Sequence, residues 1–323
     1  MRFWGTYAKS EISLIFKRVM VGAVVIQALS FEAVFAQPEG KSVDEVAKEL
    51  SNPAGALASL FTSLEYTTYK GDLPDADDQD GWTFAFQPVL PFPVGDKGRR
   101  IILRPLVPVP LNQPVFDDEL GKGDPIKVGG GSHTTYVIPG IGEFEDGNTN
   151  LGDISFDLVY AGTEMQTKHD GFLWGVGAAG TLPTATDAAL GGSQWRLGPE
   201  VFGGLVRKWG TMGLLVSHQW NLGGSSDLAH SVTAGQYFYA VGLGKGWQIA
   251  SGPNFSYNWL ADSDQALTLP VGIGVAKTTK LGSTPVKFQV QVQYFVEQPD
   301  AFGPEWLLKF SMTPVIKNLF ARN

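Results

Sequence analysis

Apolar and polar side chains alternate over segments of about ten residues along most of this chain. The clearest segment runs from Val286 to Tyr294, where apolar residues alternate with Lys287, Gln289, Gln291 and Gln293. Successive side chains of a strand point to opposite faces, so the pattern predicts strands with one apolar and one polar face. We count about twelve such segments: 61–70, 82–90, 101–109, 153–160, 171–182, 194–206, 210–221, 231–241, 247–259, 266–277, 286–294 and 306–312.

The length of these segments separates two all-β classes. A soluble sandwich also alternates, with its apolar face inward, and period alone does not exclude it. The segments run to about 10–13 residues, however, which is nearer the transmembrane strand than the globular mode of about 5–6. Aromatic residues also gather near the predicted strand ends, as at the two interfaces of a membrane barrel: Trp82, Trp195, Trp220, Trp247, Tyr257, Trp259 and Trp306.

The connections alternate in character. Every second one is long and often acidic, such as 71–80 and 110–150, whereas those between are short, such as 207–210 and 242–246. Outer-membrane barrels have this arrangement, with an even strand number that returns both termini to the periplasm. The sequence therefore predicts an all-β, transmembrane antiparallel β-barrel of about twelve strands over 59–320, with a short N-terminal helix.

The N-terminus has the pattern of a secretory signal peptide over 1–36. Basic residues precede the apolar run Val19–Leu29, and small residues surround a cleavage point near Ala36. The alternative is a membrane anchor, but a run of about 11 residues is short for a helical span of about 20. No later stretch approaches that length, which excludes a helical membrane protein.

Residues 37–58 are predicted to form a periplasmic segment with one short helix. Val43, Val46, Ala47 and Leu50 have helical spacing, and Asn52-Pro53 ends the pattern. An apolar stripe on so short a helix needs a partner. Two interpretations remain open: a partial plug in the periplasmic mouth, or a loose leader.

Composition and motifs exclude several function classes. The chain has no Cys, so disulfide scaffolds and thiolate chemistry are excluded, and a net charge of −8 argues against nucleic-acid binding. The acidic loop Asp72–Asp80 lacks the Gly and terminal Glu of a calcium loop, so we expect no metal and no cofactor. Adjacent Ser217 and His218 point to opposite faces of a strand and cannot pair as nucleophile and base, so we expect no catalytic residues and no enzyme.

If the apolar faces meet lipid, the opposite side chains face the lumen. Two interpretations are open for them: a polar pore whose charges select solutes, or a closed interior in which ion pairs hold the barrel together. A structural or adhesion barrel that displays the 110–150 loop is a further alternative. The lumen candidates are Glu65, Gln87, Arg104, Asp153, Asp157, Arg196, Glu200, Lys287, Gln289, Gln291, Gln293 and Lys309.

Several short motifs resemble a known family. They include Asn52–Leu60 (NPAGALASL), Phe86–Pro91 (FQPVLP), Leu182–Asp187 (LPTATD), Tyr294–Asp300 (YFVEQPD) and Gly303–Trp306 (GPEW). Together with further matches over about 43–315, they resemble bacterial outer-membrane proteins usually labelled as transporters, often grouped with the meta-pathway of phenol degradation and sometimes misnamed neuromedin U. One departure is the C-terminus, where Phe320 is followed by three residues although such barrels commonly finish on an aromatic residue.

The resemblance implies a Gram-negative outer-membrane barrel with a transport role, and it transfers no catalytic residue and no established substrate. We therefore expect a channel or passive transporter for small solutes, with apolar or aromatic cargo as the family-level expectation. The expected partners are outer-membrane lipids and lipopolysaccharide, the barrel-assembly machinery and a small-molecule solute. A lipid hydrolase of the outer membrane is the less favoured alternative.

Overall fold

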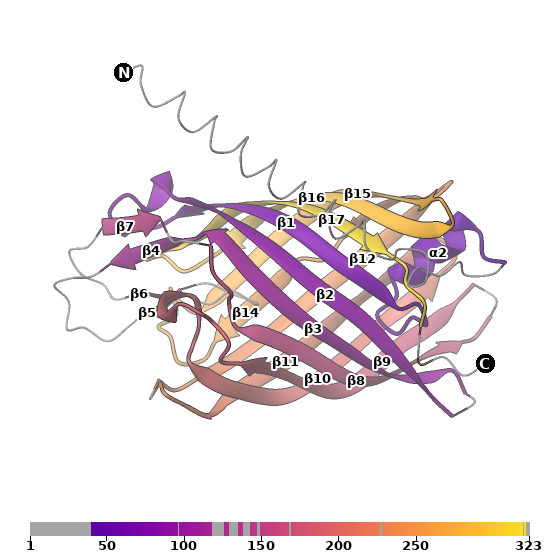
Figure 1. Cartoon of the computed structure of the whole chain (residues 1–323), viewed down its shortest axis with the longest axis horizontal. Coiled ribbons are helices and arrows are strands. Elements are labelled where there is room, and N and C mark those ends of the chain that lie inside the picture. Colours follow the sequence, from indigo (N-terminus) through magenta and orange to yellow (C-terminus); the bar gives the residue numbers. More distant parts are fainter. Residues whose placement is uncertain are drawn as a thin grey trace, which may run out of the picture.

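The computed structural model describes residues 40–95, 97–117, 126–128, 135–137, 143–146, 149–167, 169–226, 228–318 and 320. The predicted signal peptide over 1–36 and its cleavage point lie outside these residues, as do parts of the 110–150 loop. The described residues form a closed antiparallel β-barrel of twelve strands with a short helix near the N-terminus, which confirms the predicted fold class (Figure 1).

Eleven of the twelve strands are continuous, and one is divided. The wall consists of β1 (Ser59–Lys70), β2 (Asp80–Val94), β3 (Arg99–Asn112), β8 (Ile154–Met165), β9 (Gly171–Leu182), β10 (Gln194–Arg207), β11 (Gly210–Gly224), β12 (Ser231–Gly244), the divided strand β13 (Trp247–Ser251) with β14 (Asn254–Asn258), β15 (Leu267–Leu281), β16 (Thr284–Glu297) and β17 (Gly303–Pro314). Each strand pairs with its sequence neighbours, and β1 pairs with β17, where Glu65 lies opposite Lys309. Closure leaves no free sheet edge around the circumference.

The divided strand shows where the sequence prediction of one strand over 247–259 was too simple. Gly252 and Pro253 separate β13 from β14, and Pro253 has no N–H to donate to the ladder. As a result β15 pairs only with 247–249 and with 256–257 of this strand. The Tyr237 and Tyr239 hydroxyls of β12 reach across and donate to the Pro270 and Gly272 carbonyls at 2.7 and 2.9 Å, so side chains replace the missing ladder bonds.

The outer surface of the barrel is apolar. Val176, Val201 and Ile273 are 52%, 53% and 56% exposed, and many other large apolar side chains project from the same face of the strands. A contiguous apolar surface of this extent is unfavourable in water and is suited to lipid. None of the helices among the described residues is long and apolar enough to cross a membrane.

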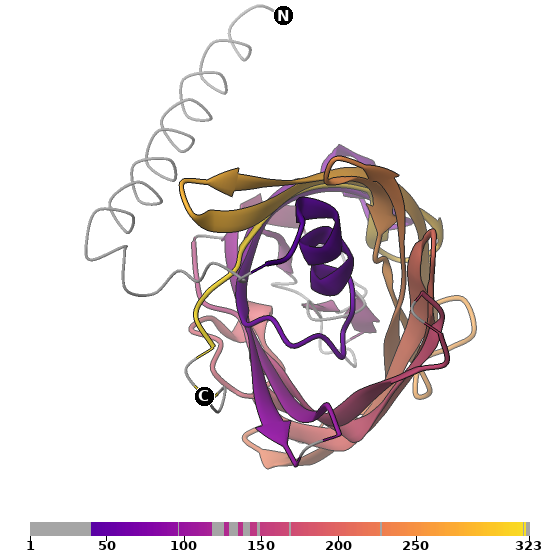
Figure 2. The ribbon, with the colours of Figure 1, turned by 90° about the vertical axis from the view of Figure 1, so that its right-hand side faces the viewer.

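The two ends of the barrel differ. At one end the strands are joined by short turns, such as those between β10 and β11 and between β12 and β13, and α2 (Val43–Leu50) lies inside this end of the barrel (Figure 2). At the other end the connections are long and contain η2 (Ala76–Asp78), η3 (Ala188–Leu190) and two short pairs: β4 (Pro114–Asp117) with β7 (Glu143–Asp146), and β5 (Ile126–Val128) with β6 (Thr135–Val137).

Helix α2 begins where the sequence predicts it. Ser42 and Glu45 form a capping box, in which the Ser42 hydroxyl accepts from the Glu45 N–H and the Glu45 carboxylate accepts from the Ser42 N–H. Val46 and Ala47 are buried against the barrel wall. The apolar stripe of this helix has therefore found its partner inside the lumen.

Candidate functional site

The barrel encloses a cavity of about 470 Å³. Eleven of the predicted lumen residues line it: Glu65, Gln87, Arg104, Asp153, Asp157, Arg196, Lys287, Gln289, Gln291, Gln293 and Lys309. Glu200 is buried directly behind the cavity surface, where it contacts Arg104. The interior is therefore a polar compartment with side chains of both charge signs.

One cluster of charges joins β3, β8 and β10. The Arg104 guanidinium lies 2.9 Å from the Asp157 carboxylate and 3.5 Å from the Glu200 carboxylate. Arg104 and Asp157 are direct partners in the β3–β8 ladder, so the backbone register fixes the first contact. Glu200 comes from the second strand beyond β8, so the curvature of the wall brings its carboxylate toward the Arg104 guanidinium.

A second ion pair joins β1 and β17. The Lys309 ammonium lies 2.9 Å from the Glu65 carboxylate, and the Ser63 hydroxyl donates to the same carboxylate at 2.8 Å. Glu65 and Lys309 are also register partners. Cross-strand pairing of opposite charges on the inward face stabilises the point at which the barrel closes.

Asp153 has a different environment from the other lumen candidates. Its carboxylate accepts from the Thr184 and Ala185 N–H groups at 3.1 Å and from the Gly192 N–H at 2.8 Å. These three donors belong to the connection between β9 and β10. Asp153 therefore anchors a long loop at the rim of the cavity.

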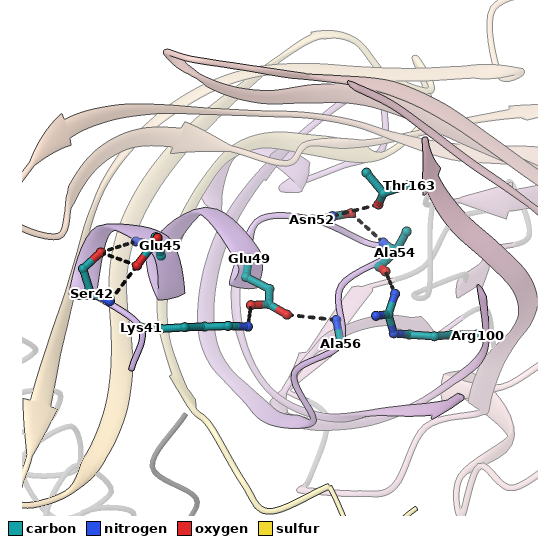
Figure 3. Close-up of polar contacts among 9 residues, drawn as sticks. All are labelled: Lys41, Ser42, Glu45, Glu49, Asn52, Ala54, Ala56, Arg100 and Thr163. Atoms are coloured by element: carbon teal, nitrogen blue, oxygen red, sulfur yellow. Dashed lines mark hydrogen bonds and ion pairs between the residues drawn. The ribbon is translucent and has the colours of Figure 1, made fainter. Parts of the chain in front are cut away.

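At the opposite end, residues 42–57, which we call the plug segment, lie inside the barrel, and several of them line the cavity (Figure 2). The Asn52 amide donates to the Thr163 hydroxyl, and Arg100 donates to the Ala54 carbonyl at 3.1 Å (Figure 3). Within the segment, Glu49 accepts from the Ala56 N–H. Glu49 also forms an ion pair with Lys41, the residue just before the segment. These contacts tie the chain after α2 to β3 and β8 as it crosses the lumen.

Helix α2 is held on the other side of the lumen. The Asp44 carboxylate accepts from the Lys245 and Gly246 N–H groups in the turn between β12 and β13. Gly246 has a φ of +78°, and a Cβ there would lie 2.7 Å from Val43 and 2.2 Å from the Thr278 carbonyl, so glycine permits both the turn and the close approach. Lys48 donates to the Arg207 carbonyl at 2.8 Å, and burial lowers the pKa of this ammonium.

An apolar cluster fills the lumen beside the plug segment. Ile102, Leu173 and Phe202 are almost fully buried on the inward faces of β3, β9 and β10, and Ala54 of the plug segment packs against them. Further into the cavity, apolar side chains share its lining with the charges: Phe61, Leu106, Leu215, Phe238 and Phe295. These residues could not be found from the sequence, because an apolar residue on the inward face has no distinctive sequence signal.

The predicted interface aromatics project from the outer surface near strand ends. Trp195, Trp220 and Trp259 lie at the end with long connections, whereas Trp247 adjoins the short turn beside α2, where Lys277 lies 4.9 Å from its ring. Trp82 is half-buried and packs against Tyr66, and Trp306 packs against Tyr294. Tyr257 is 37% exposed and contacts Trp259.

The Ser217–His218 pair does not form. Ser217 lines the cavity, whereas the His218 ring packs against Trp220 on the other face of β11. Its Nδ1 lies 2.8 Å from the Thr233 hydroxyl and its Nε2 lies 3.3 Å from the Ser231 hydroxyl. Both ring nitrogen atoms are thus bonded on the outer surface, where an unsatisfied polar group would be costly in lipid.

Comparison with known proteins supports the fold. No family model and no curated protein matches the chain, so the family resemblance inferred from short motifs stays a prediction. Among solved structures, an outer membrane channel from Pseudomonas putida F1 superposes with a TM-score of 0.52 at 13% identity, covering 80% of this chain and 95% of that one. The toluene transporter TodX of Pseudomonas putida (TM-score 0.37, 12% identity, 84% and 93% covered) and a FadL homologue of Pseudomonas aeruginosa (0.35, 10%, 83% and 93%) are more distant.

Proposed function

We propose that this chain is an outer-membrane channel through which small solutes pass by passive diffusion. The observation that carries the proposal is the combination of a closed barrel, an apolar outer surface and a cavity of about 470 Å³ lined by charged and amide side chains. A barrel that served only as a scaffold would need no hydrated compartment at its centre.

The two unlike ends support an orientation. Outer-membrane barrels have short turns on the periplasmic side and long loops outside, so the end that holds α2 faces the periplasm. The signal peptide over 1–36, removed near Ala36, would deliver the chain to that compartment, and the barrel-assembly machinery would insert it among outer-membrane lipids and lipopolysaccharide. The plug segment would then occlude the periplasmic mouth.

The lining supports solutes that have an apolar or aromatic body. Phe61, Leu215 and Phe238 share the cavity with charged residues of both signs, so the lumen is amphipathic. Clefts of this kind bind ligands through apolar walls and orient them through a few polar groups. We therefore extend the proposal to apolar or aromatic small molecules.

The test is single-channel conductance of the purified, refolded mature chain in a planar bilayer, with a salt gradient to measure ion selectivity. We expect discrete conductance steps with weak selectivity, because acidic and basic side chains are interspersed along the lining. A correctly folded barrel that stays silent, both as the full mature chain and without its plug segment, would contradict the proposal and would indicate a closed structural barrel.

A further inference from the structure

The cavity has a polar row along one wall and apolar side chains on other strands. On β16, four inward side chains form a polar row: Lys287, Gln289, Gln291 and Gln293. In the half of the barrel opposite β16 in strand order, Leu106 of β3 and Leu215 of β11 contribute apolar surface to the same cavity. A ligand that fills this space meets the polar row of β16 on one side, and on the other side it meets apolar side chains that lie beside the charges of Arg104 and Asp157.

Lys287 differs from Arg104 and Lys309 in its counterion. Arg104 and Lys309 each lie within 3 Å of a carboxylate. Lys287 is only 8% exposed, and among the described residues no carboxylate lies within ion-pair distance of its ammonium, which donates instead to the Ser51 hydroxyl at 2.9 Å. A buried ammonium without a counterion is costly, and an anionic ligand would remove that cost.

Further along the same wall, other donors lack partners. Gln291 is 3% exposed and Ser251 is 4% exposed, and both line the cavity. The Gln291 Nε2 and the Ser251 Oγ atoms have no hydrogen-bond partner among the residues that the structure describes. They belong to one cluster, because the Gly252 N–H donates to the Gln291 carbonyl oxygen at 3.3 Å. This wall is therefore rich in donors with free capacity.

We infer that the cavity contains a binding site for a monocarboxylate with an apolar or aromatic body. The carboxylate binds the Lys287 ammonium in competition with the Ser51 hydroxyl of the plug segment, and the apolar body lies against Leu106 and Leu215. Lys287 contributes a single positive charge that no carboxylate pairs among the described residues, which fits a monoanion, and the donors of Gln291 and Ser251 further along the wall are neutral. The inference rests on the proposed channel function and adds the charge class of the solute.

The test is equilibrium binding to the full mature chain in lipid nanodiscs, with protein-free nanodiscs subtracted to remove partitioning into lipid. The probes are 3-phenylpropanoate, the neutral 3-phenylpropanol and the cationic 2-phenylethylammonium, which share a phenyl body. We expect the carboxylate to bind most tightly and the cation most weakly.

The two decisive variants, Lys287→Met and Lys309→Met, each remove one interior charge. Lys287→Met should weaken carboxylate binding about tenfold or more, as expected for loss of a charged hydrogen-bond partner, and should leave binding of the alcohol within about twofold. Lys309→Met is the matched control, because it lowers the interior charge equally but removes an ammonium already paired with Glu65. Lys287→Arg should retain the preference, and Gln291→Leu should weaken carboxylate binding about threefold through a neutral donor.

Two results would overturn the inference. The first is that the carboxylate and the alcohol bind equally well. The second is that Lys287→Met and Lys309→Met weaken carboxylate binding equally, which would indicate that the overall electrostatic field of the lumen, and not one site, attracts the anion. Conductance of the same preparations separates this failure from that of the proposed function. Ion conductance with no carboxylate preference removes only the binding site, whereas a silent chain with or without the plug segment removes the channel itself.

Discussion

Arg104 links three strands of the barrel interior through its contacts with two carboxylates. It contacts Asp157 in the neighbouring strand and Glu200 from β10, so a single cation balances two carboxylates. The Arg104 contact is made to Glu200 Oε1, and the Glu200 Oε2 atom has no hydrogen-bond partner in the described part of the chain. Two carboxylates that face one cation repel each other once the cation is removed.

We expect Arg104→Met to destabilise the folded barrel by about 3 kcal/mol, since breaking a buried ion pair leaves uncompensated charge. The same variant should shift ion selectivity toward cations, because it increases the negative charge of the lining. Urea unfolding followed by tryptophan fluorescence measures the first effect, and reversal potential in a salt gradient measures the second. Arg104→Lys is the control that keeps the charge, and equal stability of Arg104→Met and the unaltered chain would refute the structural role.

At the scale of the strand, the alternation in β16 assigns each residue to one solvent. Phe288 and Val290 are 38% and 47% exposed on the outer surface, whereas Gln289 and Gln291 line the cavity. A shift of one residue in register would exchange the two sets. Labelling of single residues on β16 therefore tests directly which face of the barrel wall meets lipid.

Cysteine introduced at Phe288 or Val290 is expected to react with membrane-confined reagents, because these side chains project from the apolar outer surface. Cysteine at Gln289 or Gln291 should react with small water-soluble reagents from within the lumen. Since the chain has no native Cys, each variant carries a single reactive thiol. The opposite labelling pattern would show that the barrel faces are inverted.

At the scale of the whole molecule, the plug segment lies across the lumen inside one end of the barrel (Figure 2). Its helix packs against β12, β13, β15 and β16, while Ala54 packs on the apolar cluster of β3, β9 and β10. The segment thus bridges opposite halves of the wall. Its removal would open the mouth without cutting a strand of the barrel.

We expect a mature chain that begins at Ala58, and so lacks the plug segment, to conduct more current per channel than the full mature chain. The point variant Asp44→Asn should raise the open fraction without changing the largest conductance, because it weakens the contact between α2 and the turn at Lys245 and Gly246. Asp72→Asn makes the same chemical change in an exposed loop at the other end and serves as control. Identical currents from the full mature chain, the truncated chain and Asp44→Asn would mean that the plug segment does not limit conduction.

Much of this architecture could be predicted because alternation is a local property. Each strand can be located from the residues of its own segment, since side-chain direction in a strand depends only on sequence parity, and the count of about twelve follows from these segments. The bounds of α2 follow in the same way from helical spacing within its own residues. The split at Gly252 and Pro253 was missed. A Gly-Pro pair within a long alternating segment does not itself reveal which neighbouring strand loses its ladder bonds.

The sequence by itself therefore determined the fold class, the approximate strand boundaries and which side chains share the polar face. Tertiary structure alone decided which charges meet, such as Arg104 with Glu200, where α2 packs, and that Lys287 has no carboxylate beside it among the described residues. Those outcomes depend on distances between strands far apart in the chain, which barrel closure, curvature and tilt set together. Local periodicity carries no information about them, because each strand encodes its own two faces but not the residue that it will face across the lumen.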